Sequence, residues 1–198
     1  MTRGRIVGTG STTPKRILTN KELESIVDTS DEWITRRTGI KERRISSDGR
    51  GEDTSELATS ASLKALKMAD VSPQDLDMIV MGTVTPDRQF PSAACLVQKG
   101  LQANKAVAFD VSAGCSGFLY ALAIANNAIV TGGSTNALVI GAERLSVITN
   151  WEDRGTCILF GDGAGAFVLQ ASDKPGGVLS AVMRADGSGG DLLSVPAG

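Results

Sequence analysis

Short, largely apolar runs alternate with longer stretches of helical character through the middle of this chain. Apolar runs of four to six residues are typical of strands buried on both faces, whereas apolar residues recurring every three or four positions indicate helices. We expect strands at residues 78–81, 106–111 and 137–141, and helices at residues 54–69, 91–101 and 116–130. This alternation predicts an α/β fold, with a mostly parallel sheet covered by helices on both faces.

The remaining elements are marked mainly by capping and turn residues. We expect a strand at residues 5–8, helices at 19–27 and 30–39, a loop at 46–53, a turn at 72–75 and strands at 164–171 and 178–184. Thr19 and Glu22 have the spacing of a capping box, and Gly39 is expected to end the second helix. Residues 156–160 fit a strand or a helix. The helix at 116–130 is apolar nearly all round, so we expect it to be buried.

Charge and composition exclude several classes of function. The 198 residues carry a net charge of −2, which provides no broad basic field for nucleic acid. The chain has no histidine and only three cysteines, without metal-ligand spacing, so no metal site is expected. The N-terminus lacks the apolar core of a signal peptide, and no apolar run reaches the roughly 18 residues of a membrane span. We therefore expect a soluble, reduced, cytoplasmic protein.

Cys115 is the strongest candidate for chemistry. It lies between an expected buried strand and an expected buried helix, where open α/β sheets bind ligands. The N-terminus of the helix favours a thiolate there, and the backbone N–H of Cys115 could face a developing oxyanion. The alternative is a small core residue, and the pattern alone favours neither. Cys95 and Cys157 lie inside apolar runs and are expected to be core residues.

Two further segments have ordinary structural interpretations. Residues 161–165, "GDGAG", lack the spacing of a phosphate-binding loop, so we expect a tight turn before a buried strand. Residues 28–44 mix acidic and basic side chains, and the pattern alone favours a solvated surface helix.

Five motifs nevertheless resemble one known family. They are "DTSDEWITRRTGIKERR" (residues 28–44), "FPSAAC" (90–95), "FDVSAGCSGF" (109–118), "FGDGAGAFVL" (160–169) and "ADGSGGDLL" (185–193). Together they resemble β-ketoacyl-acyl-carrier-protein synthase III, the condensing enzyme that starts bacterial fatty-acid synthesis. The likeness extends over essentially the whole chain, and it implies a thiolase-like fold with a mixed, mostly parallel sheet.

The resemblance also implies roles for particular residues. Cys115 matches the nucleophile that takes an acyl group, usually acetyl, from coenzyme A and passes it to malonyl-acyl carrier protein. Trp33, Arg37 and Arg154 resemble the residues that hold coenzyme A: the tryptophan stacks on adenine, and Arg154 covers its other side. Phe90 resembles a phenylalanine that reaches across a homodimer to close the partner's acyl pocket. The implied thioester is a substrate, and no cofactor is expected.

The family fold consists of two similar halves, and residues 1–198 resemble the N-terminal half alone. The family's catalytic histidine and asparagine belong to the second half, which this sequence lacks. We therefore expect a piece of a longer enzyme that does not carry out condensation by itself. Two alternatives remain: a non-catalytic half that binds acyl groups or dimerises, and another thiolase-fold acyltransferase, of secondary metabolism.

Overall fold

A computed structural model describes residues 2–47 and 51–195 and contains one five-stranded sheet. The strand order is β1 (Arg3–Thr12), β7 (Asp162–Ser172), β6 (Asn136–Arg144), β4 (Met78–Gly82) and β5 (Val107–Val111). β4 pairs in parallel with β5 and β6, whereas β7 pairs antiparallel with β1 and β6. The sheet is mixed, but parallel pairing accounts for only half of its strand pairs. The prediction of a mostly parallel sheet is corrected because β7 returns antiparallel to β6 without a crossover helix.

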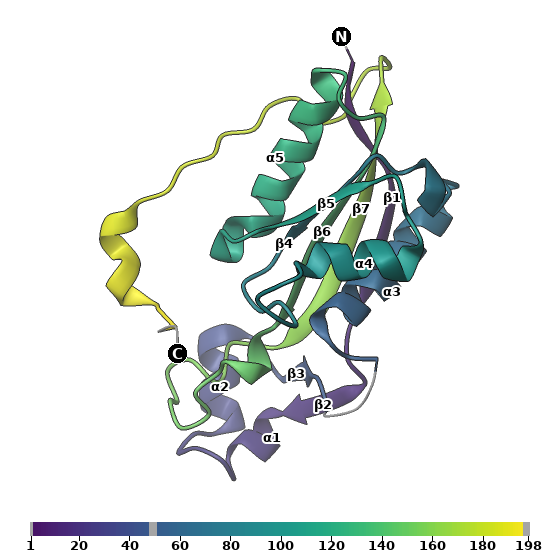
Figure 1. Ribbon diagram of the computed structural model, residues 1–198. Helices are drawn as coiled ribbons and strands as arrows, with labels where there is room; N and C mark the ends of the chain where they lie inside the picture. The colour runs from purple at the N-terminus through teal and green to yellow at the C-terminus, as the bar shows by residue number, and fades with distance from the viewer. Residues whose placement is uncertain (1, 48–50, 196–198) are drawn as a thin grey trace.

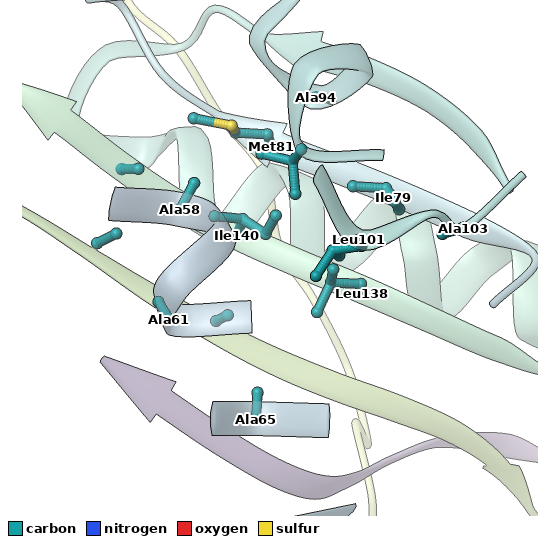
Figure 2. Close-up of a cluster of buried hydrophobic side chains, with 14 of the residues drawn as sticks. Ala58, Ala61, Ala65, Ile79, Met81, Ala94, Leu101, Ala103, Leu138 and Ile140 are labelled. Carbon is teal, nitrogen blue, oxygen red and sulfur yellow. The ribbon is translucent and has the colours of Figure 1, made fainter. Parts of the chain in front are cut away.

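Helices cover both faces of this sheet, as expected. α3 (Thr54–Ala69) and α4 (Ala93–Leu101) pack on one face, and α5 (Gly117–Val130) packs on the other (Figure 1). Successive residues of β4 point to opposite faces of the sheet. Ile79 and Met81 pack in the cluster with α3 and α4, and Val80 packs in the cluster with α5. Figure 2 shows the larger cluster, in which small alanines of α3 face the branched side chains of β4 and β6.

Four short elements form a small lobe beyond one end of the sheet (Figure 1). They are β2 (Arg16–Thr19), α1 (Asn20–Leu23), α2 (Asp31–Thr38) and β3 (Glu42–Ile45). β2 and β3 pair antiparallel. The sequence analysis missed both strands because each has four residues and little apolar character. They are stabilised by a cluster in which Leu18 and Ile45 pack with Cys157 and Ile158, more than a hundred residues away.

The helix boundaries largely follow the predicted caps. Thr19 and Glu22 form the capping box, Ser30 caps α2, and Gly39 ends α2 with φ +75°. α3 spans the predicted residues. α1 is shorter than predicted. After Leu23 the N–H groups of Ser25 and Ile26 donate to the carbonyls three residues earlier, so the chain continues in turns rather than as an α-helix.

Four other expectations need correction. Residues 178–184 form no strand within the described chain, because they pass over α5, where no strand edge is available. Residues 156–160 form neither a strand nor a helix, and residues 156–159 are turns. In "GDGAG", residues 162–165 lie within β7 rather than in a turn before it. α5 is buried on one side only, and Leu119 is 62% exposed. None of the helices in the described ranges is long and apolar enough to cross a membrane.

Candidate functional site

Three candidate residues follow three neighbouring parallel strands. Cys115 follows β5, Phe90 lies in the connection after β4, and Arg154 lies in the connection after β6. Because β4 pairs in parallel with both other strands, the three carboxyl ends meet at one edge of the sheet. This edge is where open α/β sheets generally bind ligands.

Cys115 lies on a single 3-10 turn, Gly114–Ser116, that leads from β5 into α5. Gly114 has φ +52°, a conformation that favours glycine, and Cys115 itself is exposed. The exposure contradicts the alternative in which Cys115 is a core residue. The helix begins two residues beyond Cys115, so this residue directly precedes the first turn of α5, whose N–H groups have no carbonyl partners within the helix.

The other two cysteines have different surroundings. Cys157 is fully buried, as predicted, and burial raises the pKa of its thiol, with the nearby Asp153 carboxylate adding to the effect. Cys95 is half-buried, and its sulfur lies 3.5 Å from the carbonyl oxygen of Ala108. Cys115 is therefore the one exposed thiol among the three.

Glycines set the position of the α5 N-terminus. A Cβ on Gly82, the last residue of β4, would lie 2.6 Å from the backbone nitrogen of Phe118 and closer still to Gly117. A Cβ on Gly141 of β6 would lie 3.1 Å from the Cβ of Phe118. The first turn of α5 therefore rests directly on the strand backbones, and Phe118 packs edge-to-face on Phe167 at 5.0 Å.

The structure brings together the three residues predicted to hold coenzyme A. Trp33 is on α2, and the guanidinium carbons of Arg37 and Arg154 each lie 4.8 Å from the centroid of its ring. Arg37 is one helical turn beyond Trp33, whereas Arg154 comes from the connection after β6 and donates to the carbonyl of Asp28 at 3.1 Å. We call Trp33, Arg37 and Arg154 the tryptophan clamp. It combines an aromatic face with two exposed cations.

Phe90 is not a core residue: its side chain is 87% exposed. Its loop is fixed at both ends by carboxylates that the sequence analysis missed. Glu143, at the end of β6, accepts from the N–H groups of Val84 and Thr85 at 2.9 and 3.1 Å. At the other end, the carboxylate of Asp110 on β5 accepts from two N–H groups in the first turn of α4, each at 2.8 Å. An acidic residue within or directly after an apolar strand is the signal that could have revealed them.

An open cleft of about 390 Å³ begins one residue beyond Cys115. It lies between the exposed side of α5 and residues 178–184, and Tyr120 donates across it to the carbonyl of Arg184 at 2.7 Å. Its lining includes Ser116, Leu119 and Val182, so it is largely apolar.

Comparison with known proteins gives one consistent group of relatives. The family model described as 3-oxoacyl-[acyl-carrier-protein (ACP)] synthase III matches residues 109–187. A β-ketoacyl-[acyl-carrier-protein] synthase III from Caldanaerobacter subterraneus subsp. tengcongensis is 58% identical, covering 98% of this chain and 58% of the relative. The protein of the same name from Aquifex aeolicus is 54% identical over 96% of this chain and 60% of its own length. The chain thus spans about three fifths of these relatives.

Solved structures give the same grouping. The synthase III from Thermus thermophilus superposes with a TM-score of 0.92 at 42% identity, covering 98% of this chain and 59% of that one. The Aquifex aeolicus structure has a TM-score of 0.83 at 56% identity, over 86% of this chain and 55% of its own. A priming β-ketosynthase from the R1128 polyketide pathway also matches, with a TM-score of 0.83 and 40% identity over 87% and 51% of the two chains.

Proposed function

Because this chain belongs to the β-ketoacyl-[acyl-carrier-protein] synthase III family and shares its thiolase-like fold, we propose that it provides the acyl-accepting part of such an enzyme. The observation that carries the proposal is the exposed thiol of Cys115, at the carboxyl end of β5 and the start of α5. The whole protein would join an acyl-coenzyme A primer to malonyl-acyl carrier protein and so begin fatty-acid synthesis.

The first step of the proposed reaction is acyl transfer to sulfur. The Cys115 thiolate attacks the thioester carbonyl, a C–S bond to the enzyme forms, and the C–S bond to coenzyme A breaks. Coenzyme A leaves as a thiolate and takes up the proton that Cys115 released. The N-terminus of α5 supports this step because its N–H groups stabilise negative charge on sulfur and on the carbonyl oxygen.

The tryptophan clamp supports coenzyme A as the donor. Adenine can stack on the indole of Trp33, and guanidinium groups stack on a base and also attract phosphate. Both guanidiniums already lie over the Trp33 ring, so an entering base must displace one of them. We assign that movement to Arg154, which comes from a loop, whereas Arg37 is fixed on the same helix as Trp33.

The second step needs groups that this sequence lacks. Loss of carbon dioxide from malonyl-acyl carrier protein gives a carbanion, which attacks the acyl carbon and releases the Cys115 sulfur. In the proposed whole enzyme, the family's histidine and asparagine stabilise that carbanion. Removal of such groups typically slows a reaction by about 10²–10⁴-fold. We therefore propose that the 198-residue chain accepts an acyl group but does not condense it.

Intact-mass spectrometry with acetyl-coenzyme A tests the proposal. We expect one acetyl group, mapped by peptide analysis to Cys115 and lost in Cys115→Ser. Cys157→Ser is the matched control, because its buried thiol should not react. A folded chain without an adduct at Cys115 would favour the non-catalytic half. Turnover of malonyl-acyl carrier protein by this chain would show that another residue replaces the missing base.

A second candidate is a priming synthase of secondary metabolism. The 40% identity to the R1128 priming β-ketosynthase is the observation that favours it. The two candidates share the acyl-cysteine step and differ in the acyl group. Competition between acetyl-coenzyme A and longer acyl-coenzyme A donors for Cys115, measured in one reaction, distinguishes them.

A further inference from the structure

Arg43 is a buried cation that has no acidic partner among the described residues. It lies on β3, its side chain is 6% exposed, and burial lowers the pKa of its guanidinium below the ordinary value. Within residues 2–47 and 51–195, the ion pairs are Lys21–Glu24 and Arg144–Asp53, and neither involves Arg43. Burying a charge is costly unless hydrogen bonds compensate, so the groups that receive its N–H bonds are informative.

The guanidinium of Arg43 joins two segments that are distant in sequence. It donates to the carbonyl of Leu18 at 3.2 Å and to the side-chain oxygen of Asn20 at 2.8 Å. The same nitrogen that meets Asn20 also donates to the carbonyl of Ile158 at 3.1 Å. A planar fork that meets three acceptors fixes their relative positions more strictly than apolar packing does.

On one side, Asn20 extends this network to α2. Asn20 is 1% exposed, and its amide nitrogen donates to the carboxylate of Asp31 at 2.8 Å and to the carbonyl of Ile40 at 2.7 Å. Asp31 is the first residue of α2, and Ile40 directly follows the residue that caps its end. Asn20 therefore holds both ends of the helix that carries Trp33 and Arg37.

On the other side, Ile158 lies in the same turn as Arg154, residues 154–159. Within that turn, the carboxylate of Asp153 accepts from the N–H of Gly155 at 2.8 Å and from the hydroxyl of Thr156 at 2.6 Å. The N–H of Cys157 donates to the carbonyl of Asp153 at 3.0 Å. These hydrogen bonds hold the turn together, so fixing the backbone at Ile158 also fixes the backbone at Arg154.

We infer that Arg43 and Asn20 are positioning residues that set the two sides of the tryptophan clamp at the spacing needed for the nucleotide of coenzyme A. This inference rests on the proposed function of the clamp. The hydrogen bonds that Arg43 and Asn20 make within the described residues go to the segments that carry the clamp, and none goes to a clamp side chain. Removing the Arg43 guanidinium should leave the reactivity of the Cys115 thiol unchanged and weaken the binding of the nucleotide.

The experiment compares two acetyl donors on the same protein. Acetyl-coenzyme A has the nucleotide, and S-acetylpantetheine keeps the rest of the donor but lacks the nucleotide. The ratio of the second-order rates of Cys115 acylation by the two donors measures what the nucleotide contributes. The variants are Arg43→Lys, which keeps the charge without the fork, Asn20→Ala, and the two combined. Arg44→Lys is the matched control, because Arg44 is also on β3 but, among the residues that the structure describes, donates to the carbonyls of Pro14 and Lys15 alone.

We expect each single variant to lower this ratio about tenfold, the size expected for one hydrogen bond to a charged group. The rate with the truncated donor should stay within about twofold. The double variant should add little, because both changes break the same 2.8 Å bond between Arg43 and Asn20. Arg44→Lys should leave the ratio unchanged.

Other outcomes separate this inference from the function on which it rests. An unmodified chain that reacts equally well with both donors would show that the clamp does not hold the nucleotide, and the proposed donor would be wrong. A normal preference for acetyl-coenzyme A that persists in Arg43→Lys and Asn20→Ala would overturn the positioning role alone. Rates that fall equally with both donors would also overturn it, because they indicate a general loss of structure.

Discussion

The backbones of Gly82 and Gly117 are in direct contact, and this contact sets the height of the candidate nucleophile above the sheet. The Cα of Gly82 lies 3.2 Å from the position that a Cβ on Gly117 would occupy. Gly82 ends β4 and Gly117 begins α5, two residues after Cys115. A side chain on Gly82 would come within 2.4 Å of the Gly117 backbone, so it must move the start of α5 and with it the nearby Cys115.

Replacement of Gly82 by alanine should therefore affect both stability and chemistry. We expect Gly82→Ala to lower the free energy of unfolding by about 1–3 kcal/mol, the usual cost of overpacking. Acylation of Cys115 by acetyl-coenzyme A should slow at least about tenfold, because the thiol moves relative to the α5 N-terminus. Urea unfolding and intact-mass kinetics measure the two effects. Gly165→Ala is the control, since a Cβ there meets nothing within 4 Å and should change neither.

Local signals in the sequence predicted some parts of the fold and of the candidate site, and contacts between distant segments account for what was missed. α3 was predicted at its observed boundaries because its cap, its helical spacing and its length are all local signals. Cys115 was identified as the candidate nucleophile because an apolar strand, a glycine turn and an apolar helix follow one another in the sequence. β2, β3 and the role of Arg43 were missed because they depend on Cys157 and Ile158, which are brought close only by the fold.

Glu143 anchors the start of the loop that carries Phe90. Its carboxylate accepts from two backbone N–H groups and from the hydroxyls of Thr83 and Thr85. In Glu143→Gln, an amide group that donates must face some of these donors, so we expect a loss of about 1–3 kcal/mol. Hydrogen exchange at the amides of Val84 and Thr85 should become faster. Exposed Glu152 is the control, and Glu152→Gln should alter neither quantity. Unchanged exchange at both amides would contradict the anchoring role.

Cys157 should make stability fall at alkaline pH. Burial raises the pKa of its thiol in the folded chain above the ordinary value of about 8.5. The stabilisation that results is complete below the ordinary pKa and is lost as the pH rises through the raised value. The slope from this one group is at most about 1.4 kcal/mol per pH unit.

Urea unfolding with reductant between pH 7 and pH 10 measures this effect. Cys157→Ala should be less stable than the unmodified chain at pH 7, because it leaves a small cavity, but its stability should fall less steeply above pH 8.5. Cys115→Ala, which removes an exposed thiol, is the control and should keep the steep fall. Parallel curves for the unmodified chain and Cys157→Ala would rule out Cys157 as the source.

A substitution of Phe90 should affect function without affecting stability, because Phe90 is 87% exposed in the single chain. Phe90→Ala should change the free energy of unfolding by no more than about 0.5 kcal/mol. If Phe90 serves the partner's site in a homodimer, as the family resemblance implies, the same substitution should slow acylation of Cys115 in the other subunit. Sedimentation velocity checks the dimer first, and a monomer at all concentrations would contradict this arrangement.

Mixed dimers locate the effect of Phe90. In a dimer of Phe90→Ala with Cys115→Ser, the only reactive Cys115 is in the Phe90→Ala subunit and faces the intact Phe90 of its partner. Acylation per reactive thiol should return to the rate of the unmodified dimer, measured by intact mass. A rate as slow as that of the Phe90→Ala homodimer would mean that Phe90 acts on its own subunit.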